Sequence, residues 1–273
     1  MDARPIATRR ALVAASAMVL LASVACAPKV NLALPAGAGA PLTDLAAVEQ
    51  TARAACRTHP AITADLRLSG RIDGERVRGT LQVGVTRDTM RLEGLAPFGA
   101  PVFVLAAQQG RATLLLPRES AVARGDSAAD LLDAVVGVAL TPADLLAVVS
   151  GCGLADWTVR GGAGFGEAWT RVDLEGDRRL WIRRLGESGP PAIVAAEDAR
   201  WRVEYTRRDG GWPTAIRLLQ RAPGPVRTDA VLAVEGPESM EALPDGALDV
   251  QVPKDARAVT LADLRKSREL RER

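Results

Sequence analysis

Three cysteines and a single histidine are the most reactive side chains of this 273-residue chain. Cys26 differs from the other two cysteines in what precedes it, namely Arg9-Arg10, an apolar run over 11–24 and the small residue Ala25. A basic start, a short apolar run and a small residue before a cleavage point are typical of a secretory signal peptide. We therefore expect residues 1–25 to be removed and to take no part in the fold.

The tetrapeptide Ser23-Val24-Ala25-Cys26 resembles a bacterial lipobox, in which the cysteine becomes the acylated first residue after cleavage. A leucine or similar residue is usual where Ser23 stands, so ordinary secretion and a short membrane anchor are the alternatives. No later segment has the roughly 18 apolar residues that a spanning helix requires. Acyl chains on Cys26 would thus hold the protein on a membrane without a spanning helix.

Charge and composition divide the chain into three parts. Removing residues 1–25 takes away Arg4, Arg9, Arg10 and Asp2, so 35 basic and 33 acidic side chains become 32 and 32. A neutral domain without a concentrated basic face argues against nucleic-acid binding. Residues 26–42 are rich in Ala, Pro and Gly and are predicted to be the acylated cysteine and a flexible tether. Residues 43–273 have the length of a single domain.

Cys56 and Cys152 are left as a pair once Cys26 is acylated. In an oxidising compartment a disulfide is the simplest use of two cysteines, and two buried thiols are the alternative. His59 is the only histidine and neither cysteine belongs to a CxxC motif, so we predict no metal site. No serine lies in a GxSxG motif, and we predict no catalytic residues, no cofactor and no enzymatic activity.

Hydrophobic periodicity predicts one helix followed by many strands. Leu45, Val48 and Ala52 repeat at helical spacing after a capping Thr43. From residue 64 the period becomes two, which predicts a first hairpin. The glycine-rich run 161–166 is interpreted as a hairpin turn, because it does not complete a phosphate-binding motif. The predicted strands are 64–72, 77–85, 89–95, 102–109, 112–117, 120–124, 154–160, 165–174, 178–185, 192–197, 200–207, 212–220, 226–234 and 247–252.

Two short apolar helices are predicted between the two sets of strands, one capped by Ser127 and one by Thr141, the second ending at Gly151. A last helix is expected over 261–270. The order helix, strands, helices, strands gives a mainly β (α+β) fold. We predict an unclosed antiparallel barrel of about eleven or more strands, whose concave face the helices cover or plug.

Three segments resemble, in the same order, characteristic sequence motifs of the LolB-type outer-membrane lipoprotein receptors. They are Leu68-Ser69-Gly70-Arg71-Ile72, Leu95-Ala96-Pro97-Phe98-Gly99, and Leu140-Thr141-Pro142-Ala143-Asp144-Leu145 ending at Gly151. The resemblance covers roughly residues 45–150. It implies the fold shared with the soluble relative LolA, an unclosed antiparallel barrel in which helices cover an apolar cavity for lipoprotein acyl chains. Related lipoproteins of unassigned role share this fold, so fold is better supported than function.

Inward-facing strand positions and one face of the second insert helix are the expected lining of such a cavity. The predicted cavity residues are Leu81, Val83, Val85, Leu92, Val104, Leu145, Leu146, Val148, Val149, Trp201 and Val203. In the turn formed by Pro97, Phe98 and Gly99, the flanking prolines and Gly99 stiffen the loop. The resemblance implies a membrane-contacting residue at Phe98. The alternative is that its ring folds back as a plug under the barrel rim.

These features lead to two hypotheses of function. The first is a periplasmic acyl-chain binder anchored to the outer membrane, which receives lipoproteins from a LolA-like carrier or binds another lipid. Ala27 is not the aspartate that often retains lipoproteins on an inner membrane. The second is a structural or assembly lipoprotein with a self-filled barrel that acts through protein contacts. Alternating apolar residues line a cavity and fill a core equally well, so the sequence does not separate the two.

Overall fold

The computed structural model describes residues 32–72, 74–96, 98–184, 189–221 and 228–271. Cys26 and Pro97, two of the predicted site residues, lie outside the described residues. The chain divides into two compact units, Met1–Leu32 and Ala33–Arg273. The description that follows concerns the second unit, which contains its own hydrophobic core.

A single sheet of 15 strands forms the second unit. The strands are β1 (Ala40–Pro41), β2 (Ala61–Ile72), β3 (Glu75–Thr86), β4 (Met90–Leu95), β5 (Pro101–Gln108), β6 (Arg111–Leu116), β7 (Ala121–Gly125), β8 (Val159–Phe165), β9 (Trp169–Leu174), β10 (Arg179–Arg184), β11 (Pro191–Glu197), β12 (Trp201–Asp209), β13 (Trp212–Gln220), β14 (Asp229–Met240) and β15 (Arg257–Ala258). Two antiparallel meanders, β2–β7 and β8–β14, join where β14 pairs with β2. The sheet is unclosed, as predicted, with β1 at one edge and β15 at the other.

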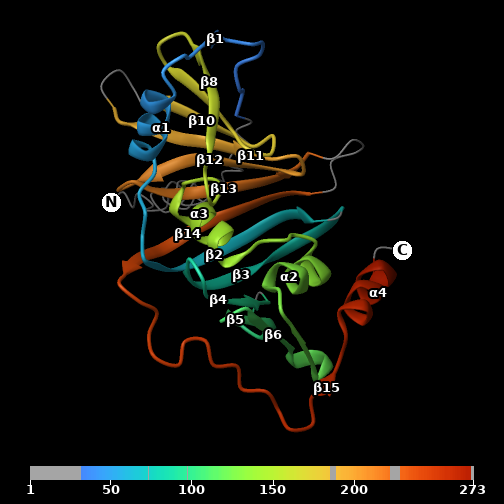
Figure 1. The fold of residues 1–273 in the computed structure, drawn as a ribbon. Helices are drawn as coiled ribbons and strands as arrows, with labels where there is room; N and C mark the ends of the chain where they lie inside the picture. Colours follow the sequence, from blue (N-terminus) through green and yellow to red (C-terminus); the bar gives the residue numbers. More distant parts are fainter. Residues whose placement is uncertain (1–31, 73, 97, 185–188, 222–227, 272–273) are drawn as a thin grey trace, which may run out of the picture. The chain divides into compact units, whose positions relative to one another are not determined.

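Among the described residues, four α-helices accompany the sheet: α1 (Leu45–Ala54), α2 (Ala128–Val136), α3 (Pro142–Ser150) and α4 (Leu261–Arg271). The first packs on β8, β9 and β11, the second on β5–β7, and the third on β2, β3 and β13. Figure 1 shows these three helices on one side of the sheet, which we call the inner face, with α4 beside α2. The predicted insert of two helices between the strand sets is therefore confirmed.

Local capping explains where the helices begin. Ser127 accepts a hydrogen bond from the backbone N–H of Asp130, and Thr141 and Asp144 form a reciprocal capping box. Gly151 ends α3 with a φ of 80°, a left-handed conformation that suits glycine. The predicted cap of α1 was wrong by one residue, because the Asp44 carboxylate rather than Thr43 accepts the N–H of Ala47, at 3.0 Å.

Rows of inward-facing side chains cross the first meander. One row pairs Ala64 with Val83, Val83 with Leu92, and Leu92 with Leu105. In the next row, Gly94 lies where the Phe103 ring fills the space, since a Cβ at Gly94 would lie 2.4 Å from that ring. The predicted alternation of β2 and β3 is confirmed by this register.

The glycine-rich run is mostly a strand, and only its last residue, Gly166, lies in the predicted hairpin turn. Gly161, Gly162 and Gly164 lie within β8, and the turn follows at 166–168. A Cβ at Gly162 would lie 2.9 Å from the carbonyl oxygen of Arg171 and 3.2 Å from Val48 of α1. The absence of side chains thus lets α1 approach the sheet.

Both ends of the second unit cover sheet edges. Part of the predicted tether, Ala40–Pro41, pairs with β8. At the other edge β15 pairs with β7 in parallel. The segment 241–256 connects β14 to β15 and is not a strand, so the predicted strand 247–252 was wrong. Its Val250 and Val252 pack against the outer face of β5–β7. Figure 1 shows this segment running around the sheet from β14 to β15. Such covers remove unpaired edge groups that would otherwise attract other strands.

Candidate functional site

The inner face beneath α3 is the candidate site, because the structure brings together there all but one of the aliphatic side chains that were predicted to line a cavity. Val83, Val85 and Leu92 of the sheet and Leu145 of α3 are buried, with exposed fractions of 4% or less. They belong to one apolar cluster with the remaining members of that set: Leu81, Leu146, Val148, Val149 and Val203.

Val104 does not belong to this face. It lies in a separate outer cluster with Leu115 and Val122, against which the segment 241–256 packs. Its neighbours Phe103 and Leu105 point inward instead. The prediction for Val104 was wrong because β5 is apolar on both faces, so alternation alone does not show which positions face inward.

Trp201 occupies an end of the predicted lining. It is half-buried at the first residue of β12, on the strand face of the buried Val203 and Tyr205. Val203 and Tyr205 belong to the apolar cluster of the inner face, so this face of β12 points inward, as predicted.

The helices fill the inner face closely. Val85 of the sheet and Val149 of α3 are both 0% exposed. A groove of 670 Å³ runs between the segment 241–256 and β5–β7, and one of 640 Å³ between the same segment and β2–β4. Neither groove lies beneath α3. A ligand at Val85 or Val149 would therefore have to displace the side chains that bury them.

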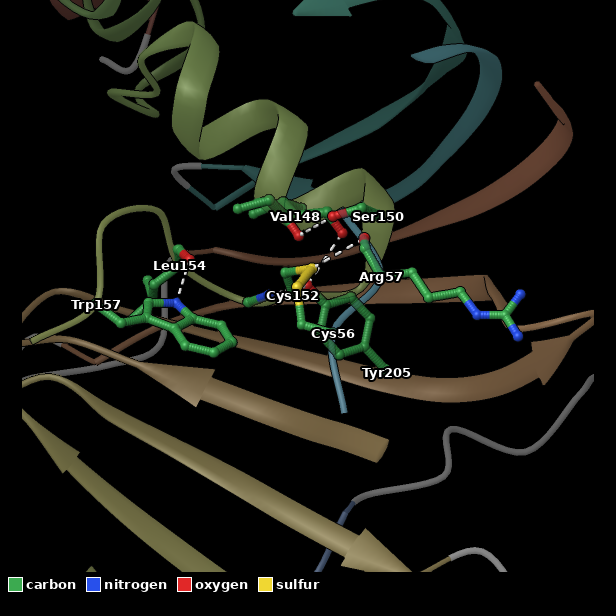
Figure 2. Close-up of a disulfide and its surroundings, with 10 residues drawn as sticks. Cys56, Arg57, Val148, Ser150, Cys152, Leu154, Trp157 and Tyr205 are labelled. Carbon is green, nitrogen blue, oxygen red and sulfur yellow. Dashed lines mark hydrogen bonds between the residues drawn. A yellow bond between two sulfur atoms is a disulfide. The ribbon is translucent and has the colours of Figure 1, made fainter. Parts of the chain in front are cut away.

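The C-terminal end of α3 is fixed to its surroundings. Cys56, after α1, and Cys152, after α3, form a disulfide with a Cα–Cα distance of 4.9 Å. Figure 2 shows this disulfide directly below the last turn of α3, beside Tyr205. The predicted pairing of the two cysteines is thus present in the structure.

Tyr205 provides a second link at the same place, which sequence reasoning missed. Its hydroxyl donates a hydrogen bond to the carbonyl oxygen of Val148 and accepts one from the N–H of Gly153, both at 3.0 Å. A Cβ at Gly153 would lie only 2.5 Å from that of Ala196, so this turn needs a glycine to rest on the sheet. The signal for Tyr205 was its inward phase in β12, but its partners are far away in sequence.

The N-terminal end of α3 is attached differently. Thr141 and Asp144 satisfy each other's backbone groups within the helix itself. Next to them lies a groove of 200 Å³, lined by Thr141 and Pro142 together with Ser127 and Ala128 of the α2 N-terminus. The start of α3 thus borders open space, whereas its end is linked covalently to the rest of the fold.

The loop between β4 and β5 presents the predicted aromatic residue to solvent. Phe98 is 99% exposed. Hydrogen bonds from the N–H of Gly99 to Ala96 and from the N–H of Ala96 to Ala100, at 2.8 and 2.9 Å, close the loop. The alternative of a plug under the barrel rim is therefore wrong for Phe98.

His59 takes part in a structural contact. Its ring stacks on Trp212 with a centroid distance of 4.3 Å, and Nδ1 lies 2.8 Å from Oγ of Ser239. Burial, and then the positive charge of Arg57, lower the pKa of His59 below its ordinary value. Within the described residues, no group of three His, Cys, Asp or Glu side chains could hold a metal ion. The same residues contain no helix long and apolar enough to span a bilayer.

No protein-family model matches the chain, and neither does any curated protein sequence. A solved structure of a LolA superfamily protein from Nitrosomonas europaea is similar, with a TM-score of 0.51 and 11% identity over 76% of this chain and 97% of that one. A DUF1329 family protein from Desulfovibrio piger follows, with a TM-score of 0.47 and 11% identity over 75% of this chain and 94% of that one.

An outer membrane lipoprotein-sorting protein domain from Vibrio parahaemolyticus has a TM-score of 0.46 and 8% identity, over 74% of this chain and 95% of that one. At 11% identity, the similarity to the LolA superfamily protein shows a common fold and not a common activity. Together with the unclosed sheet and the helices on its inner face, the first of these similarities confirms the predicted architecture. The chain therefore has a LolA/LolB-like fold.

Proposed function

We propose that this protein is a lipid-anchored periplasmic protein that binds the acyl chains of lipoproteins or of another lipid. The observation that carries the proposal is the apolar inner face under α3, where Val83, Leu92 and Leu145 belong to one aliphatic cluster. An acyl chain that replaced helix contacts on this face would be removed from water, which is favourable by about 0.8 kcal/mol per CH₂ group.

Binding on this face needs an opening, and the two ends of α3 differ in what holds them. The C-terminal end is held by the Cys56–Cys152 disulfide and by Tyr205. The N-terminal end borders the 200 Å³ groove beside α2. We therefore propose that α3 pivots about its C-terminal end and that acyl chains enter from the Thr141 end.

The proposed location follows from two further features. Acylation of Cys26 would attach the protein to the outer membrane with the domain facing the periplasm. The exposed Phe98 ring would contact the membrane while cargo is inserted. A soluble LolA-like carrier is the proposed donor of that cargo.

Acyl-chain binding is tested on residues 33–273, the compact unit with its own core. Native mass spectrometry should detect co-purified lipid, and a fluorescent fatty acid should bind saturably and be displaced by a lipoprotein. Leu146→Asp places a charge on the half-buried side of α3 and should weaken probe binding at least tenfold. Leu45→Asp is the matched control, because Leu45 is 44% exposed on α1.

The outcome that would contradict the proposal is saturable binding that Leu146→Asp leaves unchanged while the variant melts like the wild type. A protein free of lipid that binds no probe would also contradict it. That second result would favour the alternative, an assembly lipoprotein with a self-filled barrel. The observation on the side of this alternative is the complete burial of Val85 and Val149 by the protein's own side chains.

A further inference from the structure

The β2–β3 hairpin carries three exposed arginines on its outer face, close to its tip. Arg71 of β2 lies directly opposite Arg76 of β3, and Arg78 lies opposite Ser69. Alternation along both strands places these side chains on the same face, since the inward positions between them are Gly70 and Val77. Three guanidinium groups thus extend from one small area of the sheet.

These three arginines have no carboxylate partner among the described residues. Glu235 of β14, which lies opposite Asp65, binds Arg67 at 2.9 Å. Asp229, which lies opposite Arg71 on the other side, binds Arg217 through two hydrogen bonds of 2.8 and 3.0 Å. Asp229 and Glu235 of β14 are therefore both already engaged by other arginines.

Placing like charges directly opposite each other on paired strands is unfavourable. Within the described residues, Arg71 and Arg76 make no ion pair that would offset this repulsion. Positions that break a local rule without a compensating contact are where a function is expected. A polyanionic partner would remove the repulsion and supply the missing contacts.

The apolar loop lies next to these arginines. Thr80 of β3 pairs with Leu95, the last residue of β4, so the loop 96–100 begins beside Gly79. A Cβ at Gly79 would lie 2.7 Å from the carbonyl oxygen of Leu95, which shows how closely the two segments approach. Arg78 is thus the neighbour of the loop that exposes Phe98, and an aromatic ring and three cations share one rim of the sheet.

We infer that Arg71, Arg76, Arg78 and Phe98 form a docking surface for anionic phospholipid headgroups. A guanidinium group binds phosphate oxygens in pairs, and an aromatic ring is favourable at the interface between headgroups and acyl chains. An acidic protein would satisfy the charges equally, but it would leave the projecting Phe98 ring unexplained. The inference rests on the proposed function insofar as a membrane-anchored domain has such a surface within reach.

The test measures binding of residues 33–273 to vesicles by co-sedimentation, without any cargo. Vesicles of phosphatidylcholine alone are compared with vesicles containing about one third phosphatidylglycerol, at low and at high salt. The wild type should bind the anionic vesicles more tightly, and salt should reduce the difference. The variant with both Arg76→Gln and Arg78→Gln should lose about tenfold or more in affinity for anionic vesicles and little for neutral ones.

Two further variants make the result specific. Arg111→Gln with Arg124→Gln removes the same charge from exposed positions at the opposite end of the neighbouring strands and should bind like the wild type. Phe98→Ser should weaken binding to both kinds of vesicle. Equal losses in the two double variants would reduce the effect to net charge and overturn the inference.

Unchanged vesicle binding in the Arg76→Gln and Arg78→Gln variant would likewise overturn it. If that variant then lost binding to an acidic carrier protein, the patch would belong to a protein interface instead. Because the assay contains no acyl-chain ligand for the inner face, a protein that fails to bind fatty acids can still confirm the docking surface. Failure of the proposed function and failure of this inference are thus distinguishable.

Discussion

The outer face of the second meander and the tip of the β2–β3 hairpin differ in how their charged side chains are arranged. In the second meander, two pairs of residues directly opposite each other carry opposite charges, namely Asp173 with Arg179 and Glu204 with Arg217. On the β2–β3 hairpin the corresponding pair is Arg71 with Arg76. Cross-strand ion pairs stabilise a sheet, whereas like pairs destabilise it. The first arrangement supports the fold, and the second is available to a partner.

The ion pairs of the second meander form a continuous network. Its contacts are Arg171–Asp173 at 2.8 Å, Arg179–Asp173 at 3.6 Å, Arg179–Glu197 at 3.8 Å, Arg202–Glu197 at 3.1 Å, Arg202–Glu204 at 3.6 Å, Arg217–Glu204 at 3.5 Å and Arg217–Asp229 at 2.8 Å. The hydrogen bonds and negative charges of Asp229 and Glu204 raise the pKa of Arg217 above its ordinary value. They outweigh the burial of its guanidinium group, which lowers the pKa. The arginines of this network are thus used within the fold, unlike Arg71, Arg76 and Arg78 near the hairpin tip.

The largest predicted effect concerns the link between the two meanders. The disulfide joins Cys56, ahead of β2, to Cys152, ahead of β8, and closes a loop with a sequence separation of 96. In the chain-entropy model such a loop stabilises the folded state by about 4–5 kcal/mol. Replacing both cysteines by serine should lower the free energy of unfolding by this order, as measured by urea denaturation.

A reducing agent should have the same effect on the wild type and none on the double serine variant. Two titratable thiols in the unreduced, denatured wild-type unit would contradict the presence of the bond. If the two meanders then unfolded in separate transitions, the disulfide would be the element that couples them.

The second prediction tests the difference in charge directly. Arg217→Gln leaves Glu204, which is 2% exposed, without one of its cations and should cost about 3 kcal/mol of stability. Arg76→Gln removes an exposed arginine that faces another arginine, so stability should change by less than about 0.5 kcal/mol. Equal losses in chemical denaturation of the two variants would remove the distinction between the regions.

Many of the strands and helices could be predicted from the sequence, because local hydrophobic periodicity and capping residues determine them. Strands β2 and β3 alternate cleanly, and the caps at Ser127 and Thr141 define the insert helices. Where both faces of a strand are apolar, alternation carries no information, and the position of Val104 was wrong for that reason. Its burial on the outer face depends on the segment 241–256, which returns from far along the chain.

The same limit applies to the candidate site. The pairing of Cys56 with Cys152 was predicted from the cysteine count. For Phe98 the sequence left an exposed ring and a plug under the rim as alternatives, and the structure shows the exposed ring. The role of Tyr205 and the close approach at Gly162 depend on which strand or helix lies opposite, and no local pattern contains that. The arginine patch is a similar case, since its meaning depends on which acids of β14 are already paired.

A smaller effect is predicted for Tyr205, which holds the end of α3 on the second meander. Tyr205→Phe removes the hydroxyl that donates a hydrogen bond to the Val148 carbonyl oxygen and accepts one from the Gly153 N–H. The shape of the ring does not change. The Gly153 N–H keeps the carbonyl oxygen of Ala147 at 3.1 Å, and the Val148 carbonyl oxygen keeps the N–H of Gly151 at 3.2 Å. Neither backbone group is left unpaired, so the loss should be about 0.5–1.5 kcal/mol per hydrogen bond removed. Hydrogen exchange should show faster opening of α3 near Ser150, and unchanged protection there would mean that the disulfide alone fixes this end.

The smallest effect is expected at His59, where the two meanders meet: its ring lies on Trp212 of β13 and near Ser239 of β14. Burial first, and then the charge of Arg57, lower its pKa in the folded state, so the unfolded chain binds the proton more readily. The free energy of unfolding should therefore fall as the pH drops below the unfolded value of about 6.5, and this loss should level off once the folded form is protonated too. His59→Gln removes this component, and the difference between the two stability curves isolates it. A difference that is constant between pH 5 and 8 would show that His59 contributes through stacking alone and not through its charge.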